Sequence, residues 1–117
     1  MISIQTFRTM AMSFPQTTEL PHFEKTSFRV NKKIFATLSE KDKIACLKFS
    51  EIDQSSFCAY DPAIIYPVPN KWGKQGWTFI VLAKIKKEML LDALTTAYCE
   101  VAPKHLAQPF LDAREQL

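Results

Sequence analysis

The chain has 117 residues, of which 47% are hydrophobic and 23% are charged, and its formal net charge is +3. These values are typical of one soluble globular domain, so we expect residues 1–117 to fold as a unit without a metal or a disulfide. No apolar stretch approaches the roughly 18 residues of a membrane span, and no signal peptide is apparent. With only two glycines, glycine-rich phosphate-binding loops are excluded.

The first part of the chain predicts a helix followed by a loop. Apolar residues recur at helical spacing after Ser3, which is a suitable N-cap, and Pro15 ends the pattern. Residues 15–26 are polar and contain two prolines, so we interpret them as a loop.

Two β-favouring runs, residues 27–30 and 33–38, flank Asn31-Lys32 and predict a hairpin. A third strand is expected at 43–49, a short helix capped by Ser50 at 50–60, and an irregular strand at 64–68, where prolines interrupt the run. Residues 70–77 read as a loop containing both glycines.

Residues 78–85 form an apolar run that predicts a central strand, and we expect Trp77 and Phe79 to pack in the core. A helix follows at 87–102. The order of these elements predicts an α+β fold, in which N- and C-terminal helices pack on one face of an antiparallel sheet.

Positive charge is concentrated in two stretches without acidic residues, although the chain contains 12 Asp and Glu in total. One stretch lies between Glu24 and Glu40, and the other between Asp61 and Glu88. Their basic residues are Lys25, Arg29, Lys32, Lys33, Lys71, Lys74, Lys84, Lys86 and Lys87. Such patches attract phosphate backbones, although lysines at strand ends also serve solubility. Trp72, beside Lys71 and Lys74, is the better candidate for an exposed aromatic contact.

Several segments together resemble the MmcQ/YjbR family. They are Phe28-Arg29-Val30, the run from Lys33 to Leu38, the block Pro69-Asn70-Lys71-Trp72-Gly73-Lys74-Gln75-Gly76-Trp77-Thr78, and Val101-Ala102-Pro103-Lys104. The resemblance implies a CyaY-like α+β domain with a double-wing arrangement that is described as DNA-binding. It places one wing at residues 29–33 and the other at 70–76, which we call the first and second basic segments. The nucleic-acid-binding residues expected there are Arg29, Lys32, Lys33, Lys71, Trp72 and Lys74.

Glu19, His22 and Glu24 place two carboxylates near an imidazole, a combination that can hold a metal or transfer protons. We favour the simpler interpretation of a loop histidine that shapes the chain, and we expect no metal site. The cysteines, Cys46, Cys58 and Cys99, are odd in number and widely spaced, which favours a reducing cytoplasm over a disulfide framework. Cys46 is expected to be a small buried residue rather than a nucleophile.

The sequence therefore predicts a cytoplasmic, monomeric, non-enzymatic protein without a cofactor, whose partner is DNA. Two alternatives remain. One is a protein-interaction or regulatory module that uses the sheet face or the Trp72 loop. The other is a small-molecule binder in a pocket near His22.

Overall fold

The computed structural model describes residues 1–115 and contains five helices and six strands in those residues. In chain order they are α1 (Ile4–Met12), β1 (Thr17–His22), β2 (Lys25–Val30), β3 (Lys33–Ser39), β4 (Ile44–Lys48), α2 (Glu51–Tyr60), β5 (Ile65–Pro67), α3 (Lys71–Lys74), β6 (Trp77–Val81), α4 (Lys87–Val101) and α5 (Lys104–Glu115). Residues 116 and 117, which the expected domain includes, lie outside the described part.

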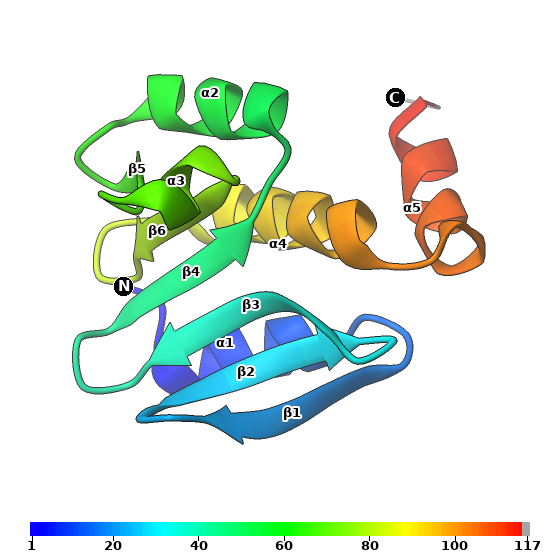
Figure 1. The fold of residues 1–117 in the computed structure, drawn as a ribbon, viewed down its shortest axis with the longest axis horizontal. Coiled ribbons are helices and arrows are strands. Elements are labelled where there is room, and N and C mark those ends of the chain that lie inside the picture. The colour runs from blue at the N-terminus through cyan, green and yellow to red at the C-terminus, as the bar shows by residue number, and fades with distance from the viewer. Residues whose placement is uncertain (116–117) are drawn as a thin grey trace.

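The strands form one antiparallel sheet in the order β1-β2-β3-β4-β6-β5. The first four strands form a meander, and α2 carries the chain to β5, from which it returns through α3 to β6. Figure 1 shows α1 and α4 behind the sheet, while the opposite face of β1–β4 is left uncovered. The predicted α+β fold, with helices before and after an antiparallel sheet, is therefore confirmed.

The core fills the space between the sheet and its helices. Alternate side chains along each strand share one face, and those on the helix side are fully buried, such as Phe28, Leu47 and Ile80. From α4, the buried Tyr98 stacks on Phe14 with ring centroids 4.9 Å apart. These contacts fix the helix layer on one face of the sheet.

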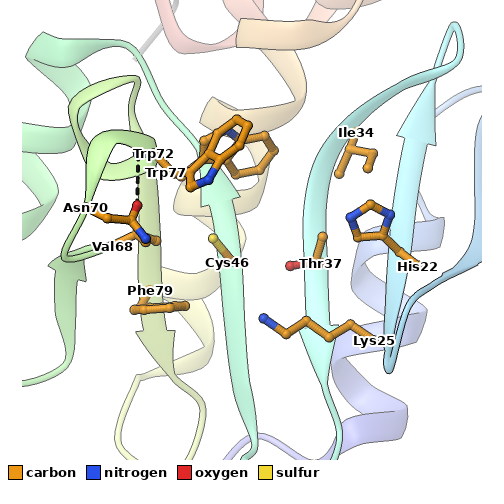
Figure 2. A pocket seen from close by; sticks show the side chains of 10 residues that line it. All are labelled: His22, Lys25, Ile34, Thr37, Cys46, Val68, Asn70, Trp72, Trp77 and Phe79. Atoms are coloured by element: carbon orange, nitrogen blue, oxygen red, sulfur yellow. Dashed lines mark hydrogen bonds between the residues drawn. The ribbon is translucent and has the colours of Figure 1, made fainter.

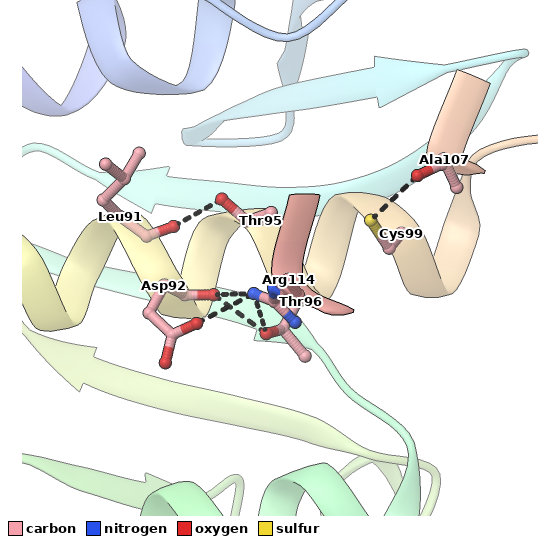
Figure 3. Close-up of polar contacts among 7 residues, drawn as sticks. All are labelled: Leu91, Asp92, Thr95, Thr96, Cys99, Ala107 and Arg114. Carbon is pink, nitrogen blue, oxygen red and sulfur yellow. Dashed lines mark hydrogen bonds and ion pairs between the residues drawn. The ribbon is translucent and has the colours of Figure 1, made fainter. Parts of the chain in front are cut away.

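The C-terminal helix α5 is tied to α4 by polar contacts near its end (Figure 3). Arg114 Nη2 donates to the Asp92 carboxylate and to the Thr96 hydroxyl, each over 2.8 Å. Nearer the start of α5, the Cys99 thiol donates to the Ala107 carbonyl oxygen over 3.8 Å. Both ends of α5 are thus anchored to one helix.

Three local expectations are wrong. Most of residues 15–26 form β1 and the start of β2, because Glu19 of β1 pairs with Phe28 in the ladder and its carboxylate binds Arg8 of α1 over 3.1 Å. Trp77 and Phe79 face the uncovered side of the sheet and are only partly buried, since their strand neighbours Thr78 and Ile80 occupy the core side. The segment 71–74 is a helical turn.

Candidate functional site

The uncovered face of the sheet holds a concave cavity of about 540 Å³. Its lining comes from the strands β1, β2, β3, β4 and β6 and from the chain around α3, as Figure 2 shows. The lining residues are His22, Lys25, Ile34, Thr37, Cys46, Val68, Asn70, Trp72, Trp77 and Phe79. None of them is acidic, and four of them carry aromatic rings. The cavity therefore presents flat apolar walls beside positive charge.

Irregular pairing between β2 and β3 shapes the floor of this cavity. The register shifts by one residue between Phe28 and Arg29, so that Phe28 pairs with Ala36 whereas Arg29 pairs with Ile34. The extra residue in β3 allows Ile34 and Thr37, three positions apart, to line the cavity together. A β-bulge thus replaces the simple alternation that a sequence pattern predicts.

Lys25 and Cys46 lie close together on the cavity floor. Lys25 comes from the start of β2, and Figure 2 shows its side chain crossing β3 beside Thr37, towards β4. Burial raises the pKa of the Cys46 thiol from 9.0 to about 11, while the nearby Lys25 ammonium and a backbone hydrogen bond from Thr78 act in the opposite direction. At this pKa the Cys46 thiol is protonated at neutral pH. The expectation that Cys46 is a small buried residue is wrong, because Cys46 is only partly buried and lines the cavity.

The second basic segment is held rigidly despite its short length. Asn70 caps α3, since its side-chain oxygen accepts a hydrogen bond from Trp72 N over 2.9 Å. A Cβ atom at Gly73 would lie 1.9 Å from the Val68 carbonyl oxygen, and one at Gly76, where φ is +104°, would lie 1.9 Å from the Phe49 carbonyl oxygen. Both glycines are needed there, Gly73 for close approach of the backbone and Gly76 also for its conformation.

Contacts from outside the segment fix its position. Gln54 of α2 donates from Nε2 to the Gly73 carbonyl oxygen over 2.8 Å and to the Thr78 hydroxyl over 3.0 Å. Lys48, at the end of β4, donates to the carbonyl oxygen of Gln75. Sequence reasoning did not single out Gln54, because nothing local distinguishes a glutamine that reaches a distant backbone.

The first basic segment is a tight turn between β2 and β3. Asn31 and Lys32 both have positive φ, 50° and 67°, the values of a type I′ hairpin turn. Arg29 pairs with the cavity residue Ile34, so it lies on the cavity side of the sheet. Its Nε donates to the Ser27 hydroxyl over 2.9 Å.

The two basic segments lie at the same end of the sheet. Lys33 begins β3, and β3 runs antiparallel to β4, so the start of β3 and the end of β4 are at one end. There Lys48 pairs with Trp77, directly after the second basic segment. The two segments therefore stand on opposite sides of the cavity, one beside β2 and the other beside β6.

The six residues expected to bind nucleic acid nevertheless face different ways. Trp72 lines the cavity and is 50% exposed. Lys71 and Lys74 line a second hollow of about 510 Å³ that also includes Gln54 and Pro67, so α3 forms a ridge between two depressions.

The basic residues of the first basic segment also point to different sides of the sheet. Lys32 lies at the tip of its turn, whereas Lys33 pairs with the core residue Val30, which places it towards the helix side of the sheet. In the described residues 1–115, the ion pairs join Arg8 to Glu19 and Glu40, and Arg114 to Asp92. No basic residue of the two segments takes part in them.

The cluster of His22 with Glu19 and Glu24 does not form as a site. Glu19 lies on the opposite face of β1 and binds Arg8. His22 instead lines the cavity, where its ring packs edge-on against Phe23 with centroids 4.9 Å apart. Within residues 1–115 no group of three His, Cys, Asp or Glu side chains is arranged to hold a metal ion, and no helix is long and apolar enough to cross a membrane.

Comparison with known proteins agrees with the resemblance seen in the sequence. The family model YjbR matches residues 12–100. The crystal structure of a Deinococcus radiodurans protein with a DUF419 domain is similar to this chain, with a TM-score of 0.74 and 19% identity, covering 86% of this chain and 78% of that one. No curated protein matches. The structural likeness supports the fold.

Proposed function

We propose that this chain, which belongs to the YjbR family, is a non-enzymatic DNA-binding protein that uses its two basic segments to contact the phosphate backbone. One observation carries the proposal: the segments flank the same concave, acid-free sheet face, and their basic side chains form none of the ion pairs found in residues 1–115. Unpaired cations that flank a common surface are suited to a polyanion, because each phosphate contact releases condensed counterions. We also propose that the protein is a cytoplasmic monomer.

The basic residues of the two segments differ in position, so we expect them to contact DNA in different ways. Lys71 and Lys74 on α3 and Lys32 at the hairpin tip are all exposed, so we expect these three to contact phosphates directly. Arg29, on the cavity side, would contact a strand that lies across the sheet. Lys33 faces the helix side and contributes mainly through long-range attraction.

A salt titration of duplex DNA binding tests this proposal. Fluorescence anisotropy with a labelled duplex, from about 50 mM salt upwards, is expected to give an affinity that falls linearly on a log–log plot. The double variant Lys71→Ala/Lys74→Ala is expected to reduce the slope by about two, because each lysine neutralises about one phosphate.

The matched control is Lys84→Ala/Lys87→Ala, which removes two exposed lysines located after β6, at the other end of the sheet. This variant is expected to bind like the wild type. Absence of binding to both duplex and single-stranded DNA at about 50 mM salt, an affinity independent of salt, or equal losses in the two double variants would each contradict the proposed role of the segments.

A further inference from the structure

The concave face carries aromatic side chains, and contacts to phosphates alone would leave these rings unused. Trp72, Trp77 and Phe79 line one side of the cavity, and His22 lines the other (Figure 2). Half of the Trp72 side chain is exposed to solvent. Exposed rings on a sheet face are the means by which many sheet proteins stack unpaired bases.

Polar groups are distributed around these rings. Lys25 lies on the floor and can donate to a carbonyl oxygen or a phosphate. The side-chain oxygen of Asn70 already caps α3, which leaves its Nδ2 free to donate into the cavity. Lys71 Nζ lies 5.6 Å from the centre of the Trp72 ring, so a base stacked on this indole would have a cation beside its phosphate.

We infer that the cavity takes unpaired bases of a DNA single strand, stacked on Trp72 and Trp77, while the two basic segments hold the phosphates on either side. This inference rests on the proposed function and specifies its substrate. A duplex keeps its bases stacked inside, so only a strand with unpaired bases can place a base against these rings. The volume of about 540 Å³ is within the range of small-ligand cavities and can hold a base with part of its sugar.

The intrinsic tryptophan fluorescence of the chain can be used as a probe of this site. Its two tryptophans both line the cavity, so a change in intrinsic fluorescence on binding reports on this place alone. The experiment compares oligothymidylate of about 12 nucleotides, an abasic strand with the same number of phosphates, and a duplex. Affinity is measured by anisotropy and base contact by tryptophan quenching.

Oligothymidylate is expected to bind about tenfold more tightly than the abasic strand and to quench the fluorescence, whereas the abasic strand does not. Trp72→Ala is expected to remove most of this tenfold difference without weakening binding to the abasic strand. Trp72→Phe is expected to restore part of it. Tyr60→Ala, which removes an exposed aromatic side chain outside the cavity, is the matched control and is expected to leave both affinities unchanged.

Equal binding of the thymidylate and abasic strands would overturn the inference, and if the duplex still bound with a steep salt dependence the proposed function would stand. Quenching by thymidine monophosphate at the same concentration as the strand would also overturn it, since the cavity would then be a small-molecule site. Failure of all three nucleic acids to bind at about 50 mM salt would remove the proposed function together with the inference.

Discussion

Gln54 Nε2 donates a hydrogen bond over 2.8 Å to the carbonyl oxygen of Gly73, and this contact joins the middle of α2 to α3. The same nitrogen also donates to the Thr78 hydroxyl over 3.0 Å. This amide group is therefore one of the contacts, together with that of Lys48, that hold the second basic segment against the sheet. We expect its effect on binding to be indirect, through the position of the α3 ridge.

Replacing Gln54 by Met keeps the length of the side chain and removes its donors. The free energy of unfolding is expected to fall by about 1–3 kcal/mol, because the part-buried hydrogen bonds from Gln54 to the Gly73 carbonyl oxygen and the Thr78 hydroxyl are lost. Urea denaturation followed by tryptophan fluorescence measures this change. Ser55→Ala, at an exposed position on the same helix, should have little effect. Equal stability of the Gln54 variant and the wild type would show that α3 is held by other contacts.

Gly73→Ala is expected to lower the stability of the fold more than Gln54→Met does. The new Cβ would lie 1.9 Å from the Val68 carbonyl oxygen, which belongs to the backbone and cannot rotate away. We expect a loss of about 3 kcal/mol or more, of the size that overpacking produces. Gln75→Ala, two positions along and exposed, provides the comparison. Thermal unfolding of the two variants tests the prediction, and similar melting temperatures would contradict it.

Lys32→Gly is expected to stabilise the protein. Lys32 has φ of 67° in the β2–β3 turn, and a side chain in this region costs about 1 kcal/mol or more. Asn-Gly is the preferred pair for such a turn. Lys33→Gly removes the same charge from the start of β3, where glycine weakens a strand, so it should destabilise. Opposite shifts in melting temperature are therefore expected, and shifts of the same sign would show that charge, not backbone conformation, dominates.

Stability is expected to decrease at alkaline pH because of Cys46. Burial raises the pKa of this thiol from 9.0 to about 11. Between these values the unfolded chain releases the proton while the folded chain retains it. The stabilising contribution is thus fully present below about pH 9 and is lost as pH rises to about 11, an effect on the order of 2 kcal/mol.

Urea denaturation at several pH values in this window measures the decrease. The variant Cys46→Ala lacks the group, so its stability should fall less steeply over the same window even if its absolute stability differs. Parallel curves for the variant and the wild type would show that other groups cause the alkaline loss.

Much of the fold was predictable because its signals are local. The helix caps at Ser3 and Ser50 both accept the expected backbone hydrogen bond, from Thr6 and from Asp53. The hairpin at 27–38 and the long helix α4 also follow from their apolar spacing. β1 was missed because it is polar and contains Pro21, and its pairing with β2 depends on contacts such as that of Glu19 with Arg8.

The candidate site was only partly predictable. Charge counting identified both basic segments, but the face of each side chain depends on strand register. The bulge beside Arg29 sets that register, and no sequence pattern marks it. That His22 and Cys46 line the same cavity likewise depends on the alignment of the four strands β1 to β4. Trp77 was assigned to the core because an apolar run does not reveal which sheet face lacks helices.

The short edge strand β5 has no backbone N–H group available to pair with a strand of a second molecule. Val68 N donates to the Trp77 carbonyl oxygen, so alternation along the strand turns the backbone groups of Ile65 and Pro67 outwards. Proline has no N–H, and the N–H of Ile65 already donates to the Asp61 carbonyl oxygen over 2.9 Å. A strand from another molecule would find no donor along Ile65–Pro67, which protects this margin of the sheet from fibril-like growth.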